Sequence, residues 1–236
     1  MAISAQRWVI SVSPLISTTM TQLITWFEIA AFLASLAAWR AIRDSRHLRL
    51  FPLLLFLIVV VEAYETFFRN KAVISNALLY NIQVPLQYLI YLLIIYHALA
   101  RPYNKKVILF EMILLAAFTL VTGCFFTPWN QFNVLAYCLG SVLLIIGIVT
   151  KFYEMLEQPA GFNFLKDPFF YMLFAFLLFN VATVPYFAMI NWLYMVKRSR
   201  NILVLLANVM SILNYILYTT YTIAFIWMIR KKALSS

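Results

Sequence analysis

Charged side chains are scarce in this sequence, at only 11% of 236 residues, whereas a soluble domain carries about a quarter. Hydrophobic residues make up 65% of the chain and aromatic residues 17%. This excess of apolar side chains excludes an ordinary soluble protein and predicts an all-α, polytopic membrane protein. Glycine is also scarce, with four residues, and no tract rich in serine, proline or glycine marks a linker. We therefore expect a single domain over residues 1–236.

Cysteine and histidine, which most often bind zinc or carry redox and nucleophilic chemistry, are nearly absent. The two cysteines, Cys124 and Cys138, form no CxxC motif, and the only histidines are His47 and His97. The motifs GxSxG, HExxH and GxGxxG and the P-loop do not occur. We predict that the protein is not an enzyme and holds no metal ion and no cofactor. An intramembrane enzyme is a third hypothesis without a recognisable nucleophile or metal site.

Two known kinds of intramembrane site also lack their defining residues. A retinal-binding protein needs a lysine in its last span for the Schiff base, and residues 201–229 contain none. Two Glu-x-x-Glu pairs, Glu62/Glu65 and Glu154/Glu157, could in principle form a carboxylate metal cage. Neither pair has a histidine partner of the kind that di-iron bundles use, so a metal cage is not predicted.

Long apolar runs dominate the rest of the sequence. About 20 residues in a helix, rising ~1.5 Å each, cross the ~30 Å hydrocarbon core of a bilayer. Seven runs have this length, so we predict a bundle of seven transmembrane helices. The predicted spans are residues 18–39, 50–69, 76–98, 106–126, 133–152, 168–190 and 201–229.

Lysine and arginine give the chain a net charge of +10, and they fall in short clusters between the apolar runs. This pattern is typical of membrane flanks, so the expected partner is the lipid bilayer and not a nucleic acid. Twelve of the eighteen cations fall on one side of the seven-span arrangement and six on the other. The bias predicts a multi-pass protein of the cell (inner) membrane, with an extracytoplasmic N-terminus and a cytoplasmic C-terminus.

The segments NALLYNIQVPLQYLIYLLIIYHAL (76–99) and FLKDPFFYMLFAFLLFN (164–180) lie in a seven-span chain that resembles a group of uncharacterised bacterial membrane proteins. The layout is also loosely similar to the membrane input domains of sensor kinases. The resemblance implies a sensor-like or accessory role and prescribes no catalytic residue. Because only RKKALSS follows the last predicted span, we expect such a sensor to act through a separate signalling partner.

A few polar side chains interrupt the predicted spans at similar depths. Counted from the basic residue on the cytoplasmic side of each span, they lie twelve to sixteen residues, or about 18–24 Å, into the membrane. These side chains are Glu28, Glu62, Gln87, Asn180 and Asn214. We predict that they form one polar layer just outside the midplane, where an outward-facing pocket binds a small ligand or a proton.

Glu62 and Glu65 lie three residues apart on one helix face. Glu65 belongs to the predicted ligand- or proton-binding set, but Arg69 follows four residues later and an ordinary ion pair would also explain it. Glu62 has no cation within a helical turn, and a lone charged carboxylate at that depth costs about 3 kcal/mol or more. Glu62 therefore has either a functional role or a structural one, as a neutral hydrogen-bonding partner of Gln87 or Asn180.

Two pairs of side chains are predicted to meet. Glu28 and Glu62 lie at nearly equal depth on consecutive antiparallel helices. If both face the bundle, their carboxylates should approach closely and share one proton, because two charges cannot coexist cheaply there. His97 and Glu111 lie near the cytoplasmic ends of two helices joined by a short loop, and we predict that they form a structural polar pair.

These features support two functional hypotheses of different classes. The first is a non-enzymatic sensor or accessory subunit that contacts its partner through the loops at residues 40–49 and 154–167. The second is a proton-coupled small-solute transporter or channel that uses Glu28 and Glu62 as relay carboxylates. A transporter should move solute in liposomes on its own, whereas a sensor should bind but not move it.

Overall fold

Seven long helices account for most of the described chain. The computed structural model describes residues 18–68, 76–128, 131–157, 163–195 and 200–234. Within these ranges the long helices are α2 (Thr18–Ala37), α4 (Phe51–Phe68), α5 (Asn76–Ala98), α6 (Pro102–Val121), α7 (Val134–Leu156), α8 (Pro168–Met195) and α9 (Arg200–Ala233). The short elements are α3 (Trp39–Ile42), the 3₁₀ turns η1 (Leu48–Leu50) and η4 (Phe164–Lys166), and the π-helical turn η3 (Thr122–Phe126). No strand occurs in these ranges, so the predicted all-α class is confirmed.

Five of the helices are long and apolar enough to cross a membrane. They are α5 over Ala77–Ala98, α6 with η3 over Pro102–Phe126, α7 over Val134–Leu156, α8 over Pro168–Phe187 and α9 over Asn208–Ala233. Helix α2 contributes a shorter apolar stretch, Gln22–Ala37. These helices indicate a helical membrane protein. A long helix occupies each of the seven predicted positions, but five of the seven meet the requirement for a span within the described residues.

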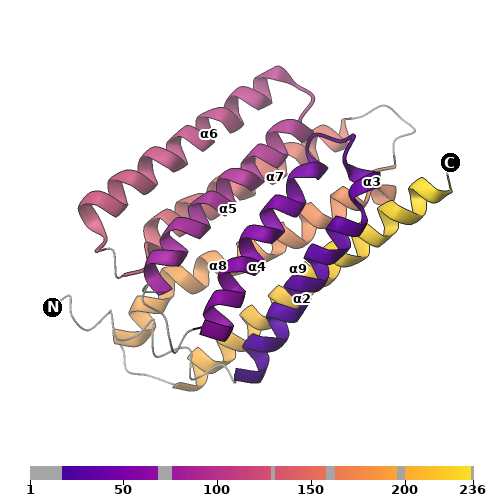
Figure 1. The fold of residues 1–236 in the computed structure, drawn as a ribbon. Coiled ribbons are helices and arrows are strands. Elements are labelled where there is room, and N and C mark those ends of the chain that lie inside the picture. Colours follow the sequence, from indigo (N-terminus) through magenta and orange to yellow (C-terminus); the bar gives the residue numbers. More distant parts are fainter. Residues whose placement is uncertain (1–17, 69–75, 129–130, 158–162, 196–199, 235–236) are drawn as a thin grey trace.

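Six of the long helices form a closed ring. In the order α2, α4, α5, α7, α8 and α9 each helix packs against the next, and α9 returns to pack against α2. Helix α6 lies outside this ring against α5 and α7, along one edge of the bundle (Figure 1). The ring therefore has its own interior, to which α2, α4, α5 and α9 all contribute.

Aromatic side chains fill the interior of the ring. The largest fully buried side chains are Tyr91, Tyr221, Phe51, Phe176 and Phe225, which come from α4, α5, α8 and α9. The rings of Tyr91 and Phe176 stack with their centroids 3.7 Å apart. Phe51 presents its ring edge-on to Tyr91, Tyr221 and Phe225, with centroids 5.7–6.5 Å apart. Such edge-to-face and stacked contacts fix ring positions more specifically than aliphatic packing does.

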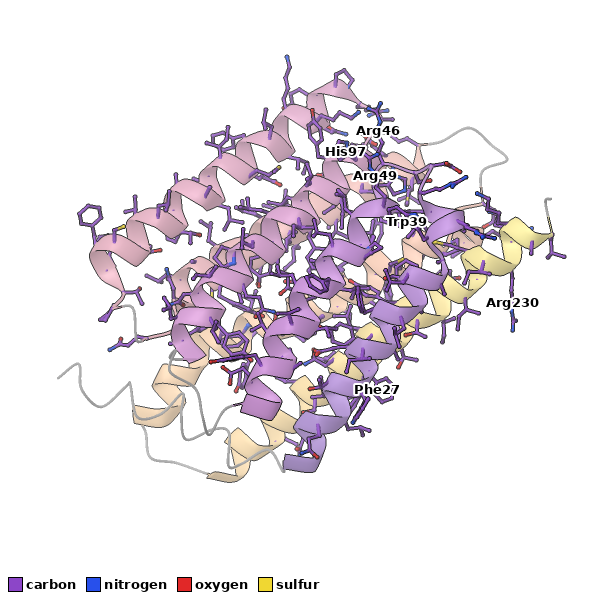
Figure 2. All side chains as sticks on the ribbon, viewed as in Figure 1. Phe27, Trp39, Arg46, Arg49, His97 and Arg230 are labelled. Atoms are coloured by element: carbon purple, nitrogen blue, oxygen red, sulfur yellow. The ribbon has the colours of Figure 1, made fainter. Side chains whose placement is uncertain are left out.

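One end of the bundle carries most of the positive charge, and we call it the basic end. Figure 2 shows Arg46, Arg49, His97 and Arg230 at this end, well away from Phe27 on α2. The turn from α2 to α4, the turn from α5 to α6 and the C-terminal end of α9 meet here (Figure 1). Lys232 near the end of α9 donates to the Arg40 carbonyl and lies 3.3 Å from Asp44 Oδ2.

A lysine–glutamate pair on α7 holds the turn between α5 and α6. Lys151 Nζ donates to the carbonyl of Ala98 at the end of α5, at 2.7 Å. Glu154 accepts from the backbone N–H groups of Ala100 and Arg101 at 2.8 and 3.1 Å, where α6 begins. Helix ends leave such backbone groups unsatisfied, and a carboxylate also complements the positive helix N-terminus. This pair therefore has a structural role.

Candidate proton-binding site

Glu28 lies near the middle of α2, and its side chain is 3% exposed. The Tyr218 hydroxyl on α9 makes a side-chain hydrogen bond with the Glu28 carboxyl. The Oε2 atom of Glu28 is buried and has no hydrogen-bond partner in the described part of the chain. A buried carboxyl oxygen without a donor is costly if the group is charged, because neither water nor protein solvates it.

Glu62 projects from α4, the next long helix along the chain, and is half-buried. The Tyr80 hydroxyl on α5 donates to Glu62 Oε1 at 3.1 Å. This is an interhelical contact between α4 and α5, as expected for a hydrogen-bonding polar group in a membrane bundle. The partner is a tyrosine, however, and not Gln87 or Asn180.

The carboxyl groups from α2 and α4 converge. Glu28 and Glu62 lie close enough for their charges to interact. Glu65, one turn further along α4, also interacts electrostatically with Glu62. All three carboxyl groups also interact electrostatically with the Tyr80 hydroxyl. The hydrophobic stretches of α2, α4, α5 and α9 contain no lysine or arginine. Within the described parts of these helices the site therefore has several acidic groups and no cation of its own, a combination that favours uptake of a proton or another cation.

A series of tyrosine hydroxyls extends from this site into the ring interior. Tyr218, which bonds Glu28, also lies close to Tyr91 on α5. The hydroxyls of Tyr91 and Tyr221 hydrogen-bond each other at 2.9 Å. Phe51 then closes the series, because its ring contacts both Tyr91 and Tyr221 edge-on. Phe51 also contacts the ring of Phe169 edge-on. The ring of Phe169 in turn lies beside that of His47 at the basic end, with the two ring centroids 4.8 Å apart.

The remaining residues of the predicted polar layer make other contacts. Asn180 is fully buried and donates to the Phe176 carbonyl of its own helix at 2.8 Å, and its Oδ1 atom has no hydrogen-bond partner among the described residues. Asn214 donates to the Met210 carbonyl, also within its own helix, at 3.0 Å. Gln87 is half-buried on α5. The structure thus brings Glu28, Glu62 and Glu65 together, whereas the two asparagines bond to their own helices.

The predicted His97–Glu111 pair does not form, and no hydrogen bond or ion pair joins these two described side chains. Glu111 is 4% exposed, its Oε2 atom has no hydrogen-bond partner in the described ranges, and it faces Gly147 on α7. His97 lies among cations at the basic end. The two helices do pack together, but their rotation directs Glu111 toward α7. The predicted Glu65–Arg69 ion pair lies outside the described residues because Arg69 does.

Tyr80 and Tyr218 are the members of the site that sequence reasoning missed. The depth of Tyr218 in the membrane could have identified it as a neighbour of Glu28. It lies twelve residues before Arg230, the same separation as between Glu28 and Arg40. Tyrosines at this spacing are common in packed helices, so the pattern alone favours a packing role. No comparable signal marks Tyr80.

One groove lies near this site without including the carboxylates. It has a volume of about 490 Å³, runs between α2 and α9, and is lined by Leu23, Phe27, Tyr215, Ile216, Thr219 and Thr220. Its lining is mainly apolar, so it does not correspond to the predicted polar pocket. Within the described ranges no cluster of three or more His, Cys, Asp or Glu side chains could hold a metal ion.

The fold and the apolar helices define the chain as a helical membrane protein with a buried carboxylate site. No protein-family model, no curated protein and no solved structure matches it.

Proposed function

We propose that the chain is a non-enzymatic sensor or accessory subunit with seven transmembrane helices that takes up a proton at Glu28 and Glu62. The observation that carries this proposal is the electrostatic interaction of these two carboxyl groups from consecutive helices, with no lysine or arginine within the described hydrophobic stretches of α2 and α4 that bear them. Two adjacent carboxylates in a low-dielectric site cannot both be charged cheaply, so one proton between them is the favoured state. Losing or gaining that proton changes the force between α2 and α4.

The same reasoning gives the proposed arrangement in the membrane. All seven long helices span the bilayer, including α2 and α4, which bear the two glutamates. The basic end faces the cytoplasm, following the twelve-to-six distribution of cations, and the membrane is the bacterial inner membrane. A separate signalling partner binds the loop at residues 40–49. This loop is joined directly to α2 and α4, so it is well placed to report their movement.

A proton-coupled transporter or channel is the second candidate function, and the tyrosine series favours it. Neighbouring hydroxyl groups can pass protons, and this series, in which Tyr91 and Tyr221 are hydrogen-bonded to each other, leads from Glu28 toward the basic end. Phe51 and Phe169 carry no hydroxyl group and interrupt the series before His47. This interruption is why we place the sensor first.

The two functions predict different results for the purified protein in liposomes. The cysteines Cys124 and Cys138 are replaced by serine, and Ser45→Cys in the 40–49 loop carries an environment-sensitive fluorophore. For a sensor, the emission should change as the pH is varied between about 5 and 9, and a pH dye inside the liposomes should report no proton flux above that of empty liposomes. The double variant Glu28→Gln/Glu62→Gln should abolish the emission change, because its amides carry no titrating proton.

The control is Glu157→Gln, which removes a carboxylate at the basic end and should leave the response unchanged. Proton flux that the double variant abolishes would establish the transporter instead. An emission change that persists in the double variant would show that these carboxyls do not sense pH.

A further inference from the structure

Four basic side chains from three separate elements converge at the basic end. Arg46 and Arg49 lie in the turn that leads into α4, His97 is in the last turn of α5, and Lys105 is in the first turn of α6. The charges of Arg46, Arg49 and Lys105 all act on the His97 imidazole. Figure 2 shows Arg46, Arg49 and His97 close together at this end of the bundle. We call these four residues the basic cluster.

In the described part of the chain no carboxylate forms an ion pair with the basic cluster. The sequence contains eight acidic residues, and all of them lie in the described part of the chain. Asp44, Glu154 and Glu157 form ion pairs with other cations, and Asp167 accepts from the Phe169 N–H at the start of α8. The other four are Glu28, Glu62, Glu65 and Glu111, which lie within α2, α4 and α6. Among the described residues, Arg46, Arg49 and Lys105 thus form no ion pair.

The surroundings of the basic cluster match those of a phosphate group at a membrane surface. Lys105 lies over the ring of Tyr96, with Nζ 5.8 Å from the ring centroid, so an aromatic side chain borders the cluster. The arginines are exposed, whereas His97 and Lys105 are half-buried between helix ends. Arginine guanidinium groups and lysine ammonium groups both donate strong hydrogen bonds to phosphate oxygens. Basic pockets between helix ends on the cytoplasmic side are typical binding sites for anionic headgroups.

We propose that the basic cluster binds the phosphodiester headgroup of an anionic phospholipid. Arg46, Arg49 and Lys105 contact the phosphate oxygens, and His97 donates a further hydrogen bond from the end of α5. The acyl chains lie along α6, whose apolar side chains Phe110, Ile113 and Leu114 are exposed outside the ring. The bound lipid then links the turn before α4 to the turn between α5 and α6.

The test measures how much phosphatidylglycerol and phosphatidylcholine stay bound to the purified protein. Native mass spectrometry counts bound lipids after extraction at about 0.3 M salt, which screens general surface attraction. The wild-type protein should retain phosphatidylglycerol in preference to phosphatidylcholine. The variant Arg46→Gln/Arg49→Gln/Lys105→Gln should retain at least about tenfold less phosphatidylglycerol, because each surface cation contributes several-fold to anionic lipid binding.

The matched control removes three other exposed cations from the same end, as Arg40→Gln/Arg230→Gln/Lys231→Gln. It has the same net charge as the first variant and should retain phosphatidylglycerol like the wild type. An equal loss of bound phosphatidylglycerol in both variants would show that only the net positive charge matters, and would overturn the proposed binding site. Competition by millimolar inorganic phosphate would also overturn the lipid assignment, because it would show that a soluble anion suffices. The single variant Arg49→Gln gives the same comparison if the triple variant is recovered in low yield.

Discussion

Replacing Glu28 and Glu62 together by glutamine should remove most of the decrease in Tm that the wild-type protein shows as the pH rises above about 7. Under the proposed function, the pair in the folded wild-type protein holds one proton at about pH 7, whereas in the unfolded chain both carboxyls are ionised. The folded state therefore binds more protons, and its stability falls as the pH rises, by about 1.4 kcal/mol per pH unit while the proton is retained. Over two pH units this corresponds to roughly 5–10 °C in Tm for a chain of this size.

The double variant should lose that dependence because its two amides cannot ionise. The measurement is the Tm in detergent micelles at about pH 7 and about pH 9, for the wild type, the double variant and Glu157→Gln. Glu157 pairs with Arg101 at 2.7 Å at the basic end, so its replacement should leave the slope unchanged. An identical slope in the wild type and the double variant would mean that the pair carries no shared proton in this range.

Gly140→Ala should be among the most destabilising single-methyl additions in the chain. Gly140 lies on α7 against Tyr88 of α5, and a Cβ atom at this position would lie 2.1 Å from Tyr88 Cδ2 and 2.5 Å from Tyr88 Cε2. The Tyr88 ring cannot simply rotate away, because its hydroxyl bonds Ser141 Oγ at 2.8 Å. Overpacking of this kind costs about 1–3 kcal/mol. The expected loss is therefore roughly 3–10 °C in Tm.

Two further glycines provide a graded comparison for this substitution. At Gly147 a Cβ atom would meet Ile108 Cδ1 at 3.2 Å, a contact that the flexible end of the isoleucine can relax. At Gly123 a Cβ atom would meet nothing within 4 Å. We expect destabilisation to decrease in the order Gly140→Ala, Gly147→Ala, Gly123→Ala, with the last close to zero. Equal effects at Gly140 and Gly123 would contradict the close approach of α5 and α7.

Hydropathy located the helices well because the length of an apolar run and its charged flanks are local properties. The observed α5, Asn76–Ala98, has the bounds of the predicted span, and α4 and α8 begin within one residue of theirs. The start of α6 was predicted four residues late, at 106 instead of 102. The polar segment PYNKK looked like a loop, but Pro102 at the first helical position and the Glu154 carboxylate allow the helix to start there.

Contacts between helices were harder to predict because they depend on how each helix is rotated. Depth along the helix placed Glu28 and Glu62 at similar levels on α2 and α4, which pack together, and the charge of Glu62 acts on Glu28 in the structure. That the two share a proton stays a prediction. The same depth argument failed for His97 and Glu111, although α5 and α6 are also adjacent. Glu111 faces α7, and the position of α6 outside the ring cannot be read from a hydropathy pattern.

Infrared spectroscopy of the protein labelled at its glutamate side-chain carboxyls tests the shared proton most directly. At about pH 7 the labelled wild type should show a protonated carboxyl band that is larger, by one group, than in the Glu28→Gln/Glu62→Gln variant. The band of Glu157→Gln should equal that of the wild type. Equal bands in the wild type and the double variant would contradict the account, because they would show that Glu28 and Glu62 are both ionised and hold no proton between them.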